Sequence, residues 1–384
     1  MKKLKYIQMI AFLAIIGGIS LASFAIKDRE FSENENRYLA KVPDITIDKI
    51  LDCSFQDQAE EYLKDQVCLR DEWITVKTFF EKSTGNTDIG GAYVGKDGYD
   101  FEKITPDDVD DIQVNKNTKA VNDFFKYCSK YIDKDKLKFM IVPTSGLVYE
   151  DKLPKNAILF DQNKYMDMIL SQINTGGTID TRKVLLNSKE DNLYYKTDHH
   201  WTTEGAFLAY NQWRYELGKN VVDKADVSFE TVTDKFRGSL YSKILDADSE
   251  YDSISVMDKD NSSYFAVTAD GEDIGSFYQE EKLSEKDKYA YFFGGNYGEV
   301  RIVNSKSAQE GNLLVIKDSF ANSFVPLIAG EYQKVYMIDL RYFAGDMTEY
   351  LSKNSITDVL VLYNVSNFIS DKNVFKLTKN IKES

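Results

Sequence analysis

The chain has 384 residues, 43% of them hydrophobic and 13% aromatic, which is ample for a packed core and excludes disorder as its general state. The formal net charge is −14, and removing the lysines at positions 2, 3 and 5 leaves −17 on the remainder. Because this part of the chain is strongly acidic, it is not expected to bind nucleic acid or polyanionic lipid by non-specific electrostatic attraction.

The N-terminal segment is expected to enter a membrane. Three lysines are the only charges in residues 1–26, and residues 7–26 are almost entirely apolar. About 20 such residues suffice to span a bilayer as a helix, and the leading lysines place the N-terminus in the cytoplasm. Ser23-Phe24-Ala25 also resembles a signal-peptidase site, so a retained anchor and a cleaved signal are both open. In both cases the rest of the chain is predicted to be extracytoplasmic, anchored in the first case and secreted in the second.

Residues 27–50 are charged and loop-like, and Pro43 interrupts any helix there. This composition predicts a stalk that leads to one domain over residues 51–384. The domain is expected to open with a helix that has Ser54 as its N-cap and extends to about Val67.

The cysteines, Cys53, Cys68 and Cys128, are too few for a disulfide framework. A helix from Ser54 to Val67 separates Cys53 from Cys68 by about 20 Å, farther than a disulfide reaches. We therefore expect three free thiols.

From residue 92 onward, short apolar runs alternate with helical segments. We expect a hairpin over 92–99, helices over 107–132, 161–173 and from Thr202 or Thr203 to Gly218, and strands over 139–142, 178–180, 313–316, 335–338 and 359–362. Runs that are apolar on both faces and separated by helices indicate a parallel sheet covered on both sides. The predicted fold is a three-layered α/β domain, with a β-rich insertion at about 222–302.

The chain has two histidines, His199 and His200, which are the only candidates for an imidazole base. If the tract is extended, Asp198 and His200 face one way and His199 faces the other. Asp198 can then orient the His200 ring, while His199 is expected to be structural or to line the site.

Ser319 is the candidate nucleophile, because it stands between the apolar run that ends at Ile316 and a helical segment. Sites of α/β proteins lie at the C-terminal ends of parallel strands, and N–H groups at a helix start can hold an oxyanion. No metal is expected, since adjacent histidines on a strand point apart and no third His or Cys lies nearby.

Asp198-His199-His200-Trp201 resembles the motif of the DHHW family of bacterial exported proteins. The wider Thr197-Asp198-x-His200-Trp201-Thr202 pattern is similar to that of the alginate O-acetylation proteins, which are SGNH-like. Further stretches agree with the resemblance: Glu33–Arg37, Val94–Gly98, Val142-Pro143, Tyr149, Lys152–Pro154, Phe236–Leu240 and Asp318–Phe320.

The resemblance implies an SGNH-hydrolase-like fold and an O-acetyltransferase. Ser319 would take up an acetyl group and pass it to a hydroxyl of a cell-surface or secreted polysaccharide, with His200 as the base and Asp198 as its orienter. A membrane-bound O-acyltransferase would supply the acetyl group, and no cofactor is implied. The chain order Asp, His, Ser is permuted relative to most SGNH hydrolases.

One departure concerns the turn, where Lys317-Asp318-Ser319 stands in place of the Gly-Thr-Ser or Gly-Asp-Ser of relatives. Arg341 and Asn364 each follow a predicted strand and are candidates for the second oxyanion donor, while His199 and Trp201 are candidates for contact with substrate. Lys96-Asp97-Gly98 and Gly238-Ser239-Leu240 are interpreted as turns without a chemical role.

Two other functions are also compatible with the sequence: a hydrolase and a protein without catalytic activity. A carbohydrate acetyl esterase would use the same three residues with water as the acceptor. A non-catalytic protein that binds glycan in an assembly would explain the altered Lys317-Asp318-Ser319 turn.

Overall fold

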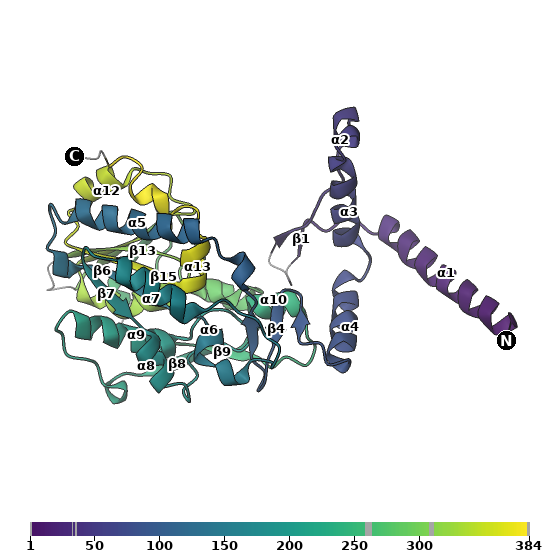
Figure 1. Ribbon diagram of the computed structural model, residues 1–384, viewed down its shortest axis with the longest axis horizontal. Helices are drawn as coiled ribbons and strands as arrows, with labels where there is room; N and C mark the ends of the chain where they lie inside the picture. The colour runs from purple at the N-terminus through teal and green to yellow at the C-terminus, as the bar shows by residue number, and fades with distance from the viewer. Residues whose placement is uncertain (1, 33, 35–36, 258–262, 307–310, 382–384) are drawn as a thin grey trace. The chain divides into compact units, whose positions relative to one another are not determined.

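The structure is a computed structural model that describes residues 2–32, 34, 37–257, 263–306 and 311–381 (Figure 1). The chain divides into two compact units, Met1–Gly90 with Tyr241–Ser249, and Gly91–Leu240 with Glu250–Ser384. Of the tract at positions 33–37, positions 33, 35 and 36 lie outside the described residues. The division into anchor (1–26), stalk (27–50) and domain (51–384) stays a prediction.

An eight-stranded sheet forms the centre of the second unit, in the order β11-β10-β12-β14-β13-β15-β6-β7. Its strands are β6 (Leu137–Val142), β7 (Gly177–Asp180), β10 (Phe265–Ala269), β11 (Glu272–Asp273), β12 (Glu299–Asn304), β13 (Asn312–Lys317), β14 (Lys334–Ile338) and β15 (Asp358–Asn364). The five strands from β14 to β7 pair in parallel, whereas β12, β10 and β11 extend the sheet with antiparallel pairs. The prediction of an α/β fold with a mainly parallel sheet is confirmed.

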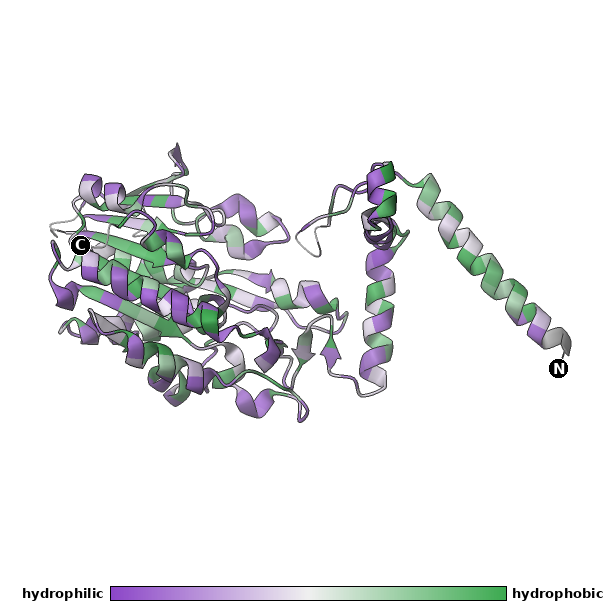
Figure 2. Ribbon diagram, turned by 45° about the horizontal axis from the view of Figure 1, so that its top comes forward, coloured by the Kyte–Doolittle hydropathy of each residue, from purple (hydrophilic) through white to green (hydrophobic). Residues whose placement is uncertain are grey.

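Helices cover both faces of this sheet (Figure 1). The helices of one face are α5 (Asp111–Cys128), α7 (Gln162–Gln172), α12 (Met347–Asn354) and α13 (Val365–Ser370), and those of the other are α9 (Thr203–Glu216) and α11 (Ala321–Ile328). Alternate residues of β13 enter different cores: Leu314 and Ile316 pack with the first group, and Leu313 and Val315 with the second. Both faces of the central strands are therefore apolar, as the green strands of Figure 2 show.

Several short elements complete the second unit. They are β4 (Ala92–Val94) and β5 (Asp100–Glu102), which form the predicted hairpin, α6 (Ser145–Val148), α8 (Arg182–Asn187), and the antiparallel pair β8 (Phe229–Phe236) and β9 (Asp252–Met257). The interval 222–302 thus holds β8 to β11 and the first four residues of β12, all in antiparallel pairs. That it is an insertion stays a prediction.

The first unit contains the N-terminal helix and four shorter helices. Its elements are α1 (Lys2–Ala25), β1 (Phe31–Ser32), β2 (Arg37–Tyr38), α2 (Ile47–Leu51), α3 (Ser54–Gln66), α4 (Arg70–Ser83), β3 (Asp88–Ile89) and most of α10 (Ser239–Ile244). Residues Lys5–Ala25 of α1 form a 21-residue span, long and apolar enough to cross a membrane (Figure 2). None of that span is buried against the rest of the described chain.

The start of α3 differs from the expectation. Cys53, not Ser54, is the N-cap, and it adopts a left-handed backbone with φ of 64°. The Ser54 N–H instead donates to the carboxylate of Asp52, at 2.9 Å, because an Asp side chain readily accepts from the backbone two residues on. The prediction of three free thiols is confirmed, since Cys53, Cys68 and Cys128 are all unpaired.

Candidate active site

The turn between β13 and α11 presents Ser319 at the C-terminal edge of the parallel strands. The Asp318 carboxylate holds this turn, because it accepts hydrogen bonds from the Phe320 N–H (2.9 Å), the Asn364 N–H (2.8 Å) and the Asn367 amide (2.8 Å). No residue of the turn has a positive φ, so its backbone needs no glycine. The Lys317-Asp318-Ser319 sequence is therefore compatible with a tight turn.

Lys317 directs its side chain into a buried polar cluster. Its ammonium donates to the side-chain oxygens of Asn296 (2.9 Å) and Asn322 (2.8 Å) and lies 3.7 Å from the Asp339 carboxylate. Burial lowers the pKa of Lys317 to about 8, although the neighbouring Asp339 opposes that shift. A lysine fits at this position because all of these partners surround it.

The structure brings together the three residues expected to act in catalysis. His200 Nδ1 lies 2.6 Å from Asp198 Oδ1, and His200 Nε2 lies 2.7 Å from Ser319 Oγ. All three residues are buried, with exposed fractions of 3% for Asp198, 5% for His200 and 8% for Ser319. A carboxylate, an imidazole and a hydroxyl in this order can activate the hydroxyl as a nucleophile.

The tract that carries the histidines is not extended, so the expected opposition of His199 and His200 is wrong. Asp198 Oδ1 also accepts the His200 N–H, at 2.9 Å, and this local bond bends the backbone. The two imidazole rings consequently lie 3.8 Å apart, tilted by 38°. His199 Nδ1 is 2.6 Å from Ser239 Oγ, and the His199 side chain is 27% exposed.

Asp198 is supported by Ser239 and by Asp252, neither of which was expected to contribute to the site. Ser239, within the predicted turn at 238–240, donates its N–H to Asp198 Oδ2 at 2.8 Å. The Asp252 carboxylate accepts from the N–H groups of Lys196 and Thr197, both at 2.8 Å, and thereby fixes the chain just before Asp198. The interpretation of Gly238-Ser239-Leu240 as a turn alone is therefore wrong.

Tyr289 is a buried contact of the site that sequence reasoning missed. Its ring stacks on the His200 imidazole with centroids 3.8 Å apart and planes within 8°. Its hydroxyl donates to the Ser319 backbone oxygen at 3.1 Å. Because nothing around Tyr289 in the sequence distinguishes it from the other 24 tyrosines, only the tertiary structure could reveal this contact.

Trp201 and Asn364, two candidates for contact with the substrate or the oxyanion, form hydrogen bonds with the protein itself. Trp201 is fully buried, and its indole N–H donates to the Phe320 oxygen at 2.9 Å, so it has no surface open to a ligand. The Asn364 amide donates to the Pro143 oxygen at 3.1 Å and accepts from the Ser366 N–H at 2.9 Å. Trp201 and Asn364 thus stabilise the walls of the site.

Arg341 remains accessible, with its side chain 36% exposed. It lies three residues beyond Ile338, which pairs in parallel with Ile316, and Ser319 lies three residues beyond Ile316. Asp339 fixes the guanidinium by accepting from Nε at 2.9 Å and from Nη2 at 2.6 Å. The pairing of β13 with β14 places Arg341 at the same edge of the sheet as Ser319, and the bidentate pair with Asp339 fixes the position of its guanidinium.

The environment holds Asp198 as an anion and His200 as a neutral base. Burial alone would raise the pKa of Asp198, but the two imidazoles and the hydrogen bonds from His200 and Ser239 hold it below its usual value. Burial and the neighbouring His199 lower the pKa of His200 from 6.5 to about 4, against the raising effect of Asp198. At neutral pH His200 is therefore ready to accept a proton.

Activity should accordingly persist as the pH falls through 6.5, the ordinary pKa of histidine, and should be lost as it approaches 4. Activity falls at low pH because protonated His200 cannot accept the Ser319 proton. The fall occurs below pH 6.5 because the pKa of His200 is lowered. The measurement is kcat/KM for p-nitrophenyl acetate against pH, corrected for unfolding by circular dichroism at each point. A midpoint near 6.5 would contradict the buried, neutral His200.

Asp198, His199 and His200 also hold their ligand atoms within 4.8 Å of one another, close enough to share a metal ion. The expectation that the two histidines point apart therefore does not argue against a metal. A stronger argument comes from His200, whose ring nitrogens already face Asp198 and Ser319. A metal bound to His200 would have to displace one of these hydrogen bonds.

Comparisons with known proteins agree with this architecture. The family model described as "DHHW protein" matches residues 87–338. A DHHW family protein from Eubacterium siraeum is 21% identical, with a TM-score of 0.63 and coverage of 77% of this chain and 97% of its own. Bacillus cereus PatB1 with a sulfonyl adduct is 23% identical, with a TM-score of 0.61 and coverage of 73% and 98%.

A more distant structure is the O-acetyltransferase domain of Pseudomonas putida AlgJ, which is 16% identical, with a TM-score of 0.46 and coverage of 73% of this chain and 93% of its own. No curated protein sequence matches the chain. Because the matched region spans more than half of its residues and contains the Asp198-His199-His200-Trp201 tract, the chain belongs to the DHHW family.

Proposed function

We propose that this protein is an O-acetyltransferase that modifies a cell-surface or secreted polysaccharide through an acetyl-serine intermediate. The observation that carries the proposal is the unbroken chain of contacts from Asp198 through His200 to the Ser319 hydroxyl, at 2.6 and 2.7 Å. The fold shared with PatB1, which forms a sulfonyl adduct, gives further support, since activated nucleophiles attack sulfonyl reagents.

The reaction has two half-steps that use the same proton acceptor. Ser319 Oγ attacks the carbonyl carbon of the acetyl donor while its proton passes to His200 Nε2, and the leaving group departs with that proton. A polysaccharide hydroxyl then attacks the acetyl-serine ester, His200 takes the hydroxyl proton, and this proton returns to Ser319 as the ester bond breaks. Asp198 holds the His200 ring in place through both steps.

The developing oxyanion needs donors, and the expected helix-start groups are occupied. The N–H groups of Phe320, Ala321 and Asn322 already donate to oxygens within the turn. We therefore assign the oxyanion role to the Ser319 N–H and the Arg341 guanidinium, and no longer to the Asn364 side chain. His199, which is partly exposed beside His200, is proposed to contact the acceptor.

The proposal places the catalytic unit outside the cell membrane in an SGNH-like domain with permuted residue order. Residues 1–26 would serve as the anchor, and residues 27–50 as the stalk. An anchored enzyme would sit beside a membrane-bound O-acyltransferase that delivers the acetyl group. The span in α1 supports this arrangement.

Purified full-length protein in detergent tests the proposal when incubated with p-nitrophenyl acetate and neutral glycan oligomers. We expect mass spectrometry to detect acetyl on the peptide that contains Ser319, together with oligomers heavier by one acetyl group. Acetyl on Ser319 with release only as acetate, even at saturating oligomer, would indicate the esterase. Glycan binding without acetylation of Ser319 would support a non-catalytic role.

A further inference from the structure

An apolar stripe covers one face of α4. It comprises Trp73, Val76 and Phe80, which are spaced by three and four residues and therefore share one side of the helix, together with Leu69, the N-cap residue just before α4. Their exposed fractions are 44%, 44%, 62% and 60%. A soluble helix normally buries such a face, so this surface calls for an apolar neighbour.

The opposite face of α4 is already held by the same chain. Thr78, half a turn away from the stripe, donates its hydroxyl to the Ile244 oxygen, and Lys82 pairs with Asp246. Both partners belong to the segment Tyr241–Ser249 of the same compact unit. The contacts of α4 with its own unit thus fix the helix with the α4 stripe facing outward.

The α4 stripe begins where α1 ends. Cys68 lies next to Leu69, and its N–H donates to the hydroxyl of Ser23, in the last turn of α1, at 2.9 Å. The Gln66 amide donates to the Arg29 oxygen at 2.9 Å, and the Tyr62 hydroxyl donates to the Asp28 carboxylate at 3.1 Å. The junction of α3 and α4 is therefore fixed at the level where the apolar span of α1 stops.

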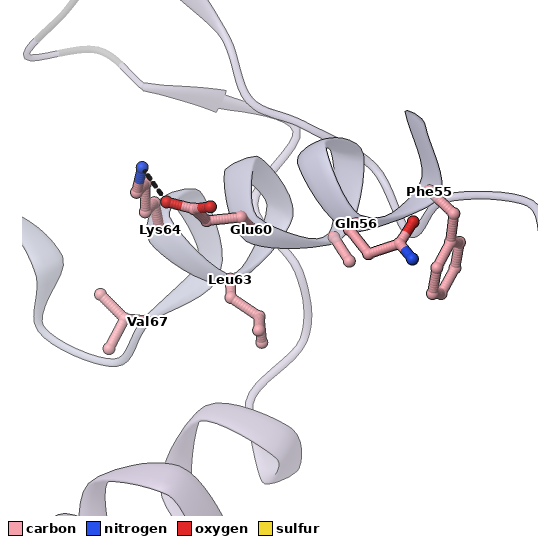
Figure 3. A pocket seen from close by; sticks show the side chains of 7 residues that line it. Phe55, Gln56, Glu60, Leu63, Lys64 and Val67 are labelled. Atoms are coloured by element: carbon pink, nitrogen blue, oxygen red, sulfur yellow. Dashed lines mark ion pairs between the residues drawn. The ribbon is translucent and has the colours of Figure 1, made fainter. Parts of the chain in front are cut away.

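Apolar surface is also present on the α3 side of this junction. Figure 3 shows Phe55, Leu63 and Val67 along one side of a shallow groove, with the Glu60–Lys64 ion pair on another. Val67 immediately precedes Cys68. Apolar side chains that are exposed, such as Leu63 at 56%, or partly exposed, such as Phe55 and Val67, thus lie on the α3 side of the contact with α1, and the α4 stripe lies on the other side.

We propose that the α4 stripe lies in the interfacial layer of the lipid bilayer that α1 crosses. Amphipathic helices bind this layer with aromatic residues on the apolar face, and tryptophan favours this depth. The 14 residues of α4 extend about 21 Å, so a helix in the membrane plane can immerse the whole stripe. The inference rests on retention of α1 as an anchor and is independent of the acetyl-transfer chemistry.

Tryptophan fluorescence in proteoliposomes tests this inference with a probe that the chain already contains. Of the three tryptophans, Trp201 and Trp213 are 0% and 1% exposed, whereas Trp73 is 44% exposed. Full-length protein in phosphatidylcholine liposomes should lose emission when the acyl chains are brominated, and external iodide should have little effect. Trp73→Phe should abolish the bromine effect, and adding Phe80→Trp to that variant should restore it.

The results distinguish a failure of the proposed membrane contact of the α4 stripe from a failure of α1 as an anchor. Quenching of Trp73 by iodide but not by brominated lipid, in protein that resists carbonate extraction, would overturn the inference and leave the anchor intact. Protection from both quenchers would also overturn it, because a second copy or a membrane-protein partner would then cover the α4 stripe. Release of the protein by carbonate would overturn the anchor together with the inference.

Discussion

Replacing Ser319 with alanine should reduce acetyl release from p-nitrophenyl acetate by about 10³-fold or more, because the variant lacks the hydroxyl that lies against His200 Nε2 and would form the ester. The same variant should no longer acetylate glycan oligomers or react with a sulfonyl fluoride. Its fold should be unchanged, since the Ser319 hydroxyl is hydrogen-bonded to His200 and its loss leaves the Asp318 contacts of the turn intact. The measurements are kcat/KM, the mass of the labelled protein and the thermal unfolding midpoint.

Ser171→Ala provides the matched control. Ser171 is exposed on α7, and its hydroxyl donates only to the Met168 oxygen one turn earlier. This variant should retain wild-type turnover and labelling at Ser319. Equal turnover by Ser319→Ala and the wild type, after correction for spontaneous hydrolysis, would remove Ser319 from the mechanism.

The central fold could be predicted because burial on both faces leaves a strong pattern. The runs that became β13, β14 and β15 are continuous in apolar residues, and polar residues end each of them at Lys317, Asp339 and Asn364. The antiparallel strands were assigned only to a broad interval, because β11 has two residues and β8 is irregular in register. Short strands with one exposed face give little periodicity to detect.

The catalytic contacts could be predicted in part, because the chain has only two histidines and Asp198 stands two positions before one of them. The conformation of the tract around His199 could not be predicted, because a hydrogen bond from the His200 N–H to the Asp198 carboxylate competes with the extended conformation. Spacing alone does not reveal which backbone group an Asp side chain accepts from. The roles of Ser239 and Tyr289 depend on tertiary packing, because Ser239 lies 40 residues along the chain from His199 and Tyr289 lies 30 residues from Ser319.

Gly238 illustrates how such packing constrains the site. A Cβ added at Gly238 would lie 2.3 Å from both Cβ and Oδ2 of Asp198 and 2.6 Å from its Cγ. Gly238 has no positive φ, so alanine is allowed by the backbone and the conflict is purely steric. The Asp198 carboxylate would have to move, and it would lose the Ser239 N–H and the alignment with His200.

Gly238→Ala should therefore lower kcat for p-nitrophenyl acetate by about 10²-fold to 10⁴-fold, the range expected when the residue that orients the base is misplaced. The matched control is Gly330→Ala, since a Cβ at Gly330 meets no atom within 4 Å, and its turnover should be that of the wild type. Overpacking also costs stability, about 1 to 3 kcal/mol, so rates are compared only below the unfolding midpoint of both variants. Sulfonyl labelling of Ser319 should slow in parallel with kcat, because both reactions need His200 to accept the Ser319 proton. Full activity in folded Gly238→Ala would show that the Asp198 position tolerates displacement, and it would remove Asp198 as the residue that orients His200.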